Sequence, residues 1–255
     1  MQKMPVLFIG HGSPMNAIED NTYTRTWRDI ATKIPEPEAI LAISAHWCTD
    51  GTRIQDNLQP KMIYDFYGLP KEIYAVNYQS PGAPDLAAAA KTLIGEGAIL
   101  DNSWGYDHGT WSVLNVMYPK THIPVFQLSV NQNASANYHF EIGKKINSLR
   151  EKGVLILGSG NVVHNLSKIN WDMEDGYDWA VKFDDYIKDK ISAGQYQDVV
   201  DYQKAGEYSK LVFDTSEHFD PLLYVLGAAD EGDRLSIYNN TCTLGSLSMT
   251  CYLLA

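Results

Sequence analysis

The feature that most constrains the fold is a series of short apolar segments that are rich in β-branched residues and bounded by turn residues. Segments of this length and composition are typical of buried strands. Because they lack a regular polar face, they favour a mainly parallel or mixed sheet that is covered on both sides. The expected strands are Val6–Ile9, Ile40–Ser44, Ile73–Asn77, Val125–Val130 and Val154–Leu157.

Segments with helical character lie between these strands. Pro84 stands in the first turn of an alanine-rich segment that ends near Ile94, a position where proline is tolerated. Over Ala134–Lys152, apolar side chains recur at helical spacing, and Gly153 follows as a stop. Two more helices are expected over Trp179–Ile191 and Pro221–Leu226, and two C-terminal strands over Arg234–Asn239 and Leu247–Leu254, as a hairpin near the sheet edge.

The alternation of strands and helices predicts one α/β domain over residues 1–255, with helices on both faces of a central sheet. The 45% hydrophobic and 20% charged residues are typical of a globular protein. A net charge of −11 without a basic run argues against a nucleic-acid surface. No apolar stretch approaches the ~20 residues of a membrane span. No pattern indicates an oligomeric state.

The three cysteines indicate a reducing compartment. Their number is odd, and Cys48, Cys242 and Cys251 have neither the spacing of a zinc knuckle nor that of a disulfide framework. The first residues lack the long apolar segment and small-residue cleavage site of a signal peptide. We therefore expect a cytoplasmic protein with buried or half-buried thiols.

Three of the seven histidines follow predicted strands. His11 comes directly after the first strand, His46 after the second, and His164 a few residues after the strand that ends at Leu157. Ligands of open α/β sheets bind outside the carboxyl ends of the strands. Neutral imidazole is the commonest side-chain ligand of zinc, iron and copper. A single histidine is more often a packed or surface residue, but three at strand ends favour a shared metal site.

The other four histidines carry weaker signals. His122 at a strand entrance and His139 on a predicted helix are expected to be structural. His218 precedes a predicted helix and could simply begin it. His108 lies in a loop ahead of a short helix, where it could line a pocket or support a ligand. The residues alone leave the roles of His108 and His218 open.

Five motifs in this order resemble those of the class III extradiol ring-cleavage dioxygenases, in particular the 4,5-DOPA dioxygenase branch. The motifs extend over nearly the whole chain, and the five together are more specific for this family than any single motif. The motifs are His11-Gly12-Ser13-Pro14, Ser44-Ala45-His46-Trp47, Asp107-His108-Gly109-Thr110-Trp111, Gly158-Ser159-Gly160-Asn161-Val162-Val163-His164-Asn165-Leu166 and Glu217-His218-Phe219-Asp220-Pro221-Leu222.

The resemblance implies one mononuclear divalent metal, Fe(II) for activity, with Zn(II) plausible in purified protein. It implies His11 and His46 as ligands, with the third from the Glu217-His218 pair. Relatives of the protocatechuate type use a carboxylate there, as in the facial triad of Fe(II) oxygenases. The motif of the DOPA branch favours His218, and a site of three imidazoles also suits Zn²⁺.

The resemblance also implies roles for two further histidines. His164 corresponds to the acid/base histidine of the family, and it could be a fourth ligand when no substrate is bound. His108 corresponds to a histidine that lines the pocket and helps proton transfer. The implied substrates are O₂ and a catechol such as L-DOPA, and both atoms of O₂ are inserted as the ring opens next to the vicinal diol.

A planar substrate predicts an aromatic pocket, and several aromatic residues lie near the motifs. None receives a firm role, because most aromatic residues of a domain belong to its core. The candidates are Trp47, Tyr64, Phe66, Tyr67 and Trp111.

Two other function classes stay open from the residues. One is a zinc hydrolase, against which the lack of an H-E-x-x-H motif counts. The other is a non-catalytic member of the fold that binds a metal or a small molecule. A dinucleotide site is rejected, because Val163 stands where the third glycine of G-x-G-x-x-G would be.

Overall fold

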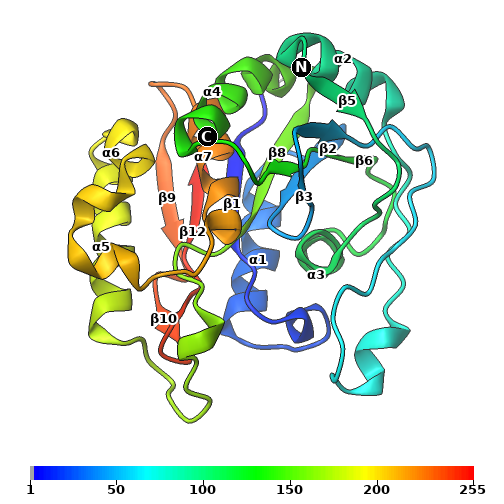
Figure 1. Cartoon of the computed structure of the whole chain (residues 1–255). Helices are drawn as coiled ribbons and strands as arrows, with labels where there is room; N and C mark the ends of the chain where they lie inside the picture. Colours follow the sequence, from blue (N-terminus) through cyan, green and yellow to red (C-terminus); the bar gives the residue numbers. More distant parts are fainter. Residues whose placement is uncertain (1–2) are drawn as a thin grey trace.

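The computed structural model describes residues 3–255 and has a six-stranded mixed sheet at its centre, with helices packed against it (Figure 1). The strand order is β6-β2-β8-β1-β12-β9. β6, β2, β8 and β1 are parallel to one another, whereas β12 pairs antiparallel with both β1 and β9. The bounds are β1 (Val6–Gly10), β2 (Ala39–Ser44), β6 (Val125–Gln127), β8 (Val154–Gly160), β9 (Leu235–Tyr238) and β12 (Cys251–Leu254).

The sheet is buried on both faces because alternate residues of its strands enter two different cores. In β1, Val6 and Phe8 pack into one core and Leu7 and Ile9 into the other. The first core includes residues of α2 (Pro84–Ile94), α4 (Ala136–Ile146), α5 (Asp178–Ser192), α6 (Tyr196–Val200) and α7 (Asp220–Ala228); the second includes those of α1 (Thr22–Lys33) and α3 (His108–Met117). The predicted α/β sheet covered on both faces is therefore confirmed.

Local sequence signals set several helix ends. The side chain of Asn21 accepts a hydrogen bond from the backbone N–H of Thr24, whose hydroxyl accepts from Asn21 in return, a capping box that starts α1. The side chain of Asp107 caps α3 by accepting a hydrogen bond from the backbone N–H of Thr110. The sequence analysis missed α1, which buries few apolar residues.

Most expected elements are present, with shifted bounds. The helix expected over 134–152 consists of α4 and a following 3₁₀ turn, Asn147–Lys152. The expected C-terminal hairpin is present as β9 and β12, with β9 at the sheet edge. Short paired strands complete the described fold: β3 (Cys48–Thr49), β4 (Thr52–Ile54), β5 (Ala98–Leu100), β7 (Val130–Asn131), β10 (Cys242–Thr243) and β11 (Leu247–Ser248).

Three strand predictions need correction. The strand expected over Leu247–Leu254 divides, because Leu247–Ser248 form β11, which pairs with β10, and only Cys251–Leu254 join the main sheet as β12. The strand expected over Ile73–Asn77 is wrong: Lys71–Ala75 form a 3₁₀ helix, in which only Ile73 is buried, so no continuous apolar strand face exists there. The segment Val125–Val130 divides into β6 and β7, because its chain leaves the main sheet after Gln127 and β7 pairs with β3. Among the described residues, no helix combines the length and apolar character needed to cross a membrane.

Candidate metal centre

The site lies where the carboxyl ends of three parallel strands meet. The backbone N–H of His11 donates to Gly160 at 2.9 Å, so His11 continues the pairing of β1 with β8. His46 follows the end of β2, and its N–H donates to the hydroxyl of Ser44. The N–H of Asn161 donates to the carbonyl of His218 at 2.8 Å, which joins the end of β8 to the start of α7. Three separate parts of the chain thus converge at one sheet edge.

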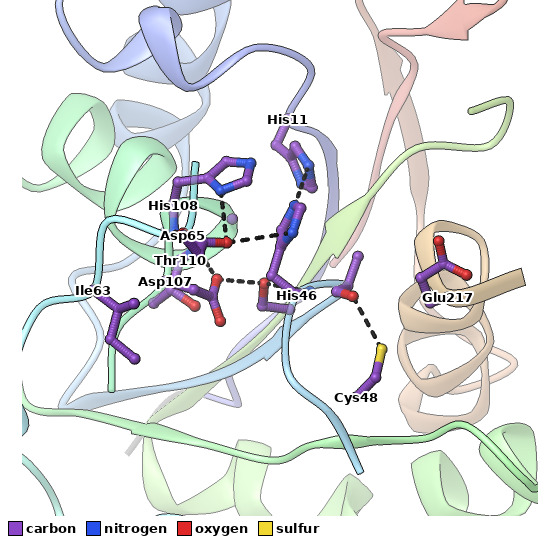
Figure 2. Close-up of polar contacts among 12 residues, drawn as sticks. His11, His46, Cys48, Ile63, Asp65, Asp107, His108, Thr110 and Glu217 are labelled. Carbon is purple, nitrogen blue, oxygen red and sulfur yellow. Dashed lines mark hydrogen bonds and ion pairs between the residues drawn. The ribbon is translucent and has the colours of Figure 1, made fainter. Parts of the chain in front are cut away.

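His11, His46 and His218 present their imidazoles to a common point. One ring nitrogen of each lies within 4.8 Å of those of the other two. The Nε2 atoms of His11 and His46 are 3.2 Å apart, as the dashed line between the two rings in Figure 2 marks. They are the three ligands that the family resemblance implied, whereas the pattern of strand ends grouped His11 and His46 with His164, the possible fourth ligand.

The hydrogen-bond partner of Nδ1 determines which nitrogen of the His11 ring carries the proton. Its Nδ1 lies 3.0 Å from the hydroxyl of Ser159, and that hydroxyl donates its own proton to the carbonyl of Gly109. The oxygen of Ser159 must therefore accept a hydrogen bond from Nδ1 of His11. This leaves Nε2 of His11 with a free lone pair that points at His46.

Carboxylates have the same effect on the other two rings. Nδ1 of His46 lies 3.4 Å from Asp65, and Nδ1 of His218 lies 3.3 Å from Glu217. A carboxylate beside Nδ1 favours the tautomer in which that nitrogen carries the proton. All three rings therefore direct unprotonated Nε2 atoms toward the same point.

This donor set fits a divalent metal. Two unprotonated nitrogens 3.2 Å apart cannot hydrogen-bond to each other, and Nε2 of His218 is buried without a partner in the described chain. Metal–nitrogen bonds of about 2.0–2.1 Å place two ligands of one ion roughly 3.0–3.4 Å apart. Burial, and then the neighbouring imidazoles, hold the pKa values of His11 and His218 well below the ordinary range, so both rings are in the neutral form that binds metals.

Asp65 connects this centre to His108. Its carboxylate accepts hydrogen bonds from Nδ1 and from the backbone N–H of His108, both at 2.9 Å (Figure 2). Burial would raise the pKa of Asp65, but the hydrogen bond from His108 and the nearby imidazoles lower it, so the group is an ionised acceptor. His46, Asp65 and His108 are close enough to form a second metal-binding group. Since Nε2 of His46 faces His11 instead, we interpret Asp65 as the carboxylate that orients the rings of His46 and His108.

His164 approaches the centre from another side. Its ring stacks on that of His218, outside the group of three. Burial lowers the pKa of His164 to about 4, so at neutral pH the ring is an uncharged base. The backbone holds it there, because the N–H of His164 donates to Val212 at 2.9 Å.

One cavity of about 540 Å³ contains all five of these imidazoles, those of His11, His46, His108, His164 and His218. The other two histidines lie elsewhere, as expected. His122 is exposed and pairs with Glu36, whereas His139 is buried beside Tyr224 and Asp220.

The cavity wall is partly aromatic. Of the five aromatic candidates, Phe66 and Tyr67 line it. Trp47 and Trp111 are buried in the core region, and Tyr64 instead donates to the carbonyl of Val76. The lining residues that could not be expected from the sequence include Glu19, Tyr23, Asp65 and Trp171. The one sequence signal for Asp65 was that it is a single aspartate within an aromatic stretch, residues 64–67.

The chain is similar to known proteins along nearly its whole length. Residues 5–248 match the family described as the catalytic LigB subunit of aromatic ring-opening dioxygenase. A protein of Escherichia coli K12 named 4,5-DOPA dioxygenase extradiol is 42% identical over an alignment of 255 positions that covers 97% of this chain and 93% of that protein. A protein of Beta vulgaris with the same name is 35% identical and covers 96% of this chain and 94% of its own length.

A solved structure has the same fold. It is the crystal structure of a protein from Escherichia coli K12 described as uncharacterised. It superposes with a TM-score of 0.87 at 39% sequence identity and covers 99% of this chain and 100% of that one.

Proposed function

The chain belongs to the class III extradiol dioxygenases, the family of the catalytic LigB subunit of aromatic ring-opening dioxygenase, and on that premise we propose that it cleaves a catechol such as L-DOPA with one Fe(II). The observation that carries the proposal is the convergence of three unprotonated Nε2 atoms at the floor of one cavity. The proposed ligands are His11, His46 and His218. Glu217 supports the ring of His218 from behind instead of joining the group.

A bound metal would supply a Lewis acid that lowers the pKa of the catechol hydroxyls and, if it is iron, a redox partner for O₂. Zn²⁺ has no redox chemistry, which is why we propose iron as the working metal although three imidazoles also suit zinc. Three ligands from the protein leave positions open for small molecules, as catalytic metal sites require.

The two remaining histidines of the cavity would handle protons. His164 is uncharged at neutral pH, so its ring can take a proton from a substrate hydroxyl and return it later in the reaction. His108 donates through Nδ1 to Asp65, which leaves its Nε2 as an acceptor for a hydroxyl of the substrate. The choice of L-DOPA rests on the names of the similar proteins and on a cavity whose wall includes Phe66 and Tyr67.

Against the competing hydrolase, the two carboxylates that contact histidines of the described cavity are both engaged. Asp65 accepts hydrogen bonds from His108, and Glu217 lies beside Nδ1 of His218.

The cysteines bear on the cellular location of the protein. The thiols of Cys48, Cys242 and Cys251 are all free, which favours a reducing compartment, and we propose the cytoplasm.

The test is oxygen uptake by protein prepared without metal and loaded anaerobically with Fe(II) or Zn(II). With L-DOPA or a simple catechol, we expect uptake and a yellow ring-opened product with Fe(II) only. A His218→Ala variant treated in the same way controls for reactions of iron in solution. Stoichiometric Fe(II) binding without oxygen uptake on any catechol would contradict the proposal.

A further inference from the structure

We propose that the cavity selects catechols by the charge of the ring substituent, favouring an ammonium group over a carboxylate, and that Glu19 is the residue that makes this selection. The inference rests on the proposed function and defines its substrate class. It follows from which charged side chains line the cavity and from where they lie.

The wall of the cavity carries acidic side chains that no lysine or arginine of the described wall balances. Two carboxylates, those of Glu19 and Asp65, line the cavity. No lysine or arginine of the described residues lines it. Asp65 belongs to the floor, where it holds His108. Glu19 is exposed and belongs to the loop between the 3₁₀ turn Pro14–Ala17 and α1.

The position of Glu19 is fixed relative to the metal centre. Its Oε2 accepts a hydrogen bond from the side-chain amide of Asn21 at 3.2 Å. The same amide donates to Asn16 at 2.8 Å, and Asn16 in turn donates to the carbonyl of His11 at 2.9 Å. A chain of three polar side chains therefore ties the rim carboxylate to the backbone of a proposed metal ligand.

Nearby cations do not neutralise Glu19. Arg25 and Arg28 both pair with Asp20, at 2.9 and 2.6 Å. No ion pair of Glu19 occurs in the part of the chain that the structure describes. The N-terminus of α1 offers little to an anion either, because Asn21 already accepts from the N–H of Thr24.

A catechol held by its two hydroxyls at the histidines directs its ring substituent away from the floor. The charges of the floor act on the two hydroxyls of every catechol alike, but they also act on a charged substituent, so the contribution of Glu19 is the difference between the wild type and a Glu19 variant. An ammonium group then gains from Glu19, whereas a carboxylate meets a like charge and no cation. For L-DOPA this means that the α-ammonium, not the α-carboxylate, is recognised, so dopamine should be used at least as well.

The test compares three catechols with side chains of similar length: dopamine, neutral 4-ethylcatechol and anionic 3,4-dihydroxyphenylpropionate. With the Fe(II)-loaded full chain, kcat/KM should fall in that order, with about tenfold between the first and the last, as expected of a partly screened charge. Glu19→Gln should shrink this ratio, and Glu19→Lys should shrink it further. Glu96→Gln, an exposed carboxylate outside the cavity, is the matched control and should keep the wild-type ratio.

A second readout does not depend on turnover. Calorimetric titration of the Zn(II)-loaded protein with the same three catechols should give the same order of affinity and the same response to the two Glu19 variants. If none of the catechols is turned over but the order of affinity holds, the dioxygenase proposal fails and the charge selection stands. Equal or reversed preferences in the wild type, or a ratio unchanged in Glu19→Gln, would overturn the selection.

Discussion

The imidazole of His164 lies parallel to that of His218, with ring centroids 3.5 Å apart and an angle of 3° between the planes. His218 is one of the three rings that face a common point, and His164 is not. The stack therefore places an uncharged base directly beside the metal centre without adding a fourth nitrogen to it.

Replacing His164 by Ala should leave the metal bound and lower turnover. Since the ring lies outside the group of three, we expect one metal per chain in the variant. A positioned acid/base group is typically worth about 10²–10⁴ in rate, so kcat should fall at least about 10²-fold. Metal content by mass spectrometry and oxygen uptake test both parts. His122→Ala, which removes an exposed histidine, should match the wild type; loss of the metal from His164→Ala would make His164 a ligand.

Glu217 and His218 should respond differently to substitution. His218→Ala removes a ring nitrogen of the centre and should abolish stoichiometric metal binding. Glu217→Gln keeps the ring and weakens only the acceptor beside its Nδ1, so affinity should fall by about 10–100-fold while stoichiometry is retained. Competition with a chelator of known affinity measures both variants. The reverse result would make the carboxylate the third ligand.

The positions of His11 and His46 could be predicted because they depend on a local rule. Each follows a buried parallel strand, and the carboxyl ends of such strands meet at one edge. His218 could not be placed in this way, since it precedes α7 and reaches the centre only because β8 packs against it. The family motifs supplied that residue where the pattern of strands did not.

The neighbours of Asp65 in the sequence mark it as an aspartate among aromatic residues but do not indicate its role. It lies in an irregular segment, and its partner His108 is 43 residues away. The wrong strand at Ile73–Asn77 has a related cause. Apolar composition suggested burial, but Ile73 is the one residue of this segment that is buried in the second core, and Val76 packs against that core half-buried. Sequence patterns report local structure well and give little information on how irregular loops pack.

Asp65→Asn should weaken the centre through two histidines at once. The amide can still accept one hydrogen bond, but it lacks the charge that favours a proton on Nδ1 of both His46 and His108. We expect metal affinity to fall by about 10-fold or more and kcat of the fully loaded protein to fall further. Asp56→Asn, a carboxylate of an exposed contact with Asn102, is the control. Unchanged affinity and unchanged kcat would contradict the supporting role.

Gly160→Ala should disrupt the site although residue 160 carries no functional group. A Cβ atom there would lie 2.0 Å from the carbonyl oxygen of His218, so the backbone before α7 would have to move. We expect lower metal affinity together with lower stability. Gly232→Ala tests the general cost of such a change, because at that exposed turn an added Cβ would meet no atom within 4 Å beyond its chain neighbours and φ is not in the left-handed region. Wild-type metal binding by Gly160→Ala would show that this close approach does not position His218.

The stability of the metal-free protein should depend on pH through the protonation of Asp184. Burial raises its pKa to about 6 from 3.8, although the hydroxyls of Ser248 and Thr250 lower it. The folded state therefore keeps a proton that the unfolded chain releases, so the contribution of Asp184 to stability is largest below about pH 4 and is lost as the pH rises to about 6.

Asp184→Asn removes this dependence. The free energy of unfolding of the wild type, relative to that of the variant, should fall by about 2 kcal/mol between pH 4 and pH 6.5 and stay nearly constant above that range. Urea titrations in the presence of a chelator at several pH values measure the difference. Asp185→Asn, which neutralises a more exposed carboxylate on the same helix, separates this effect from a general change of charge. A difference that does not vary with pH would mean that Asp184 is ionised in the folded protein over the whole range.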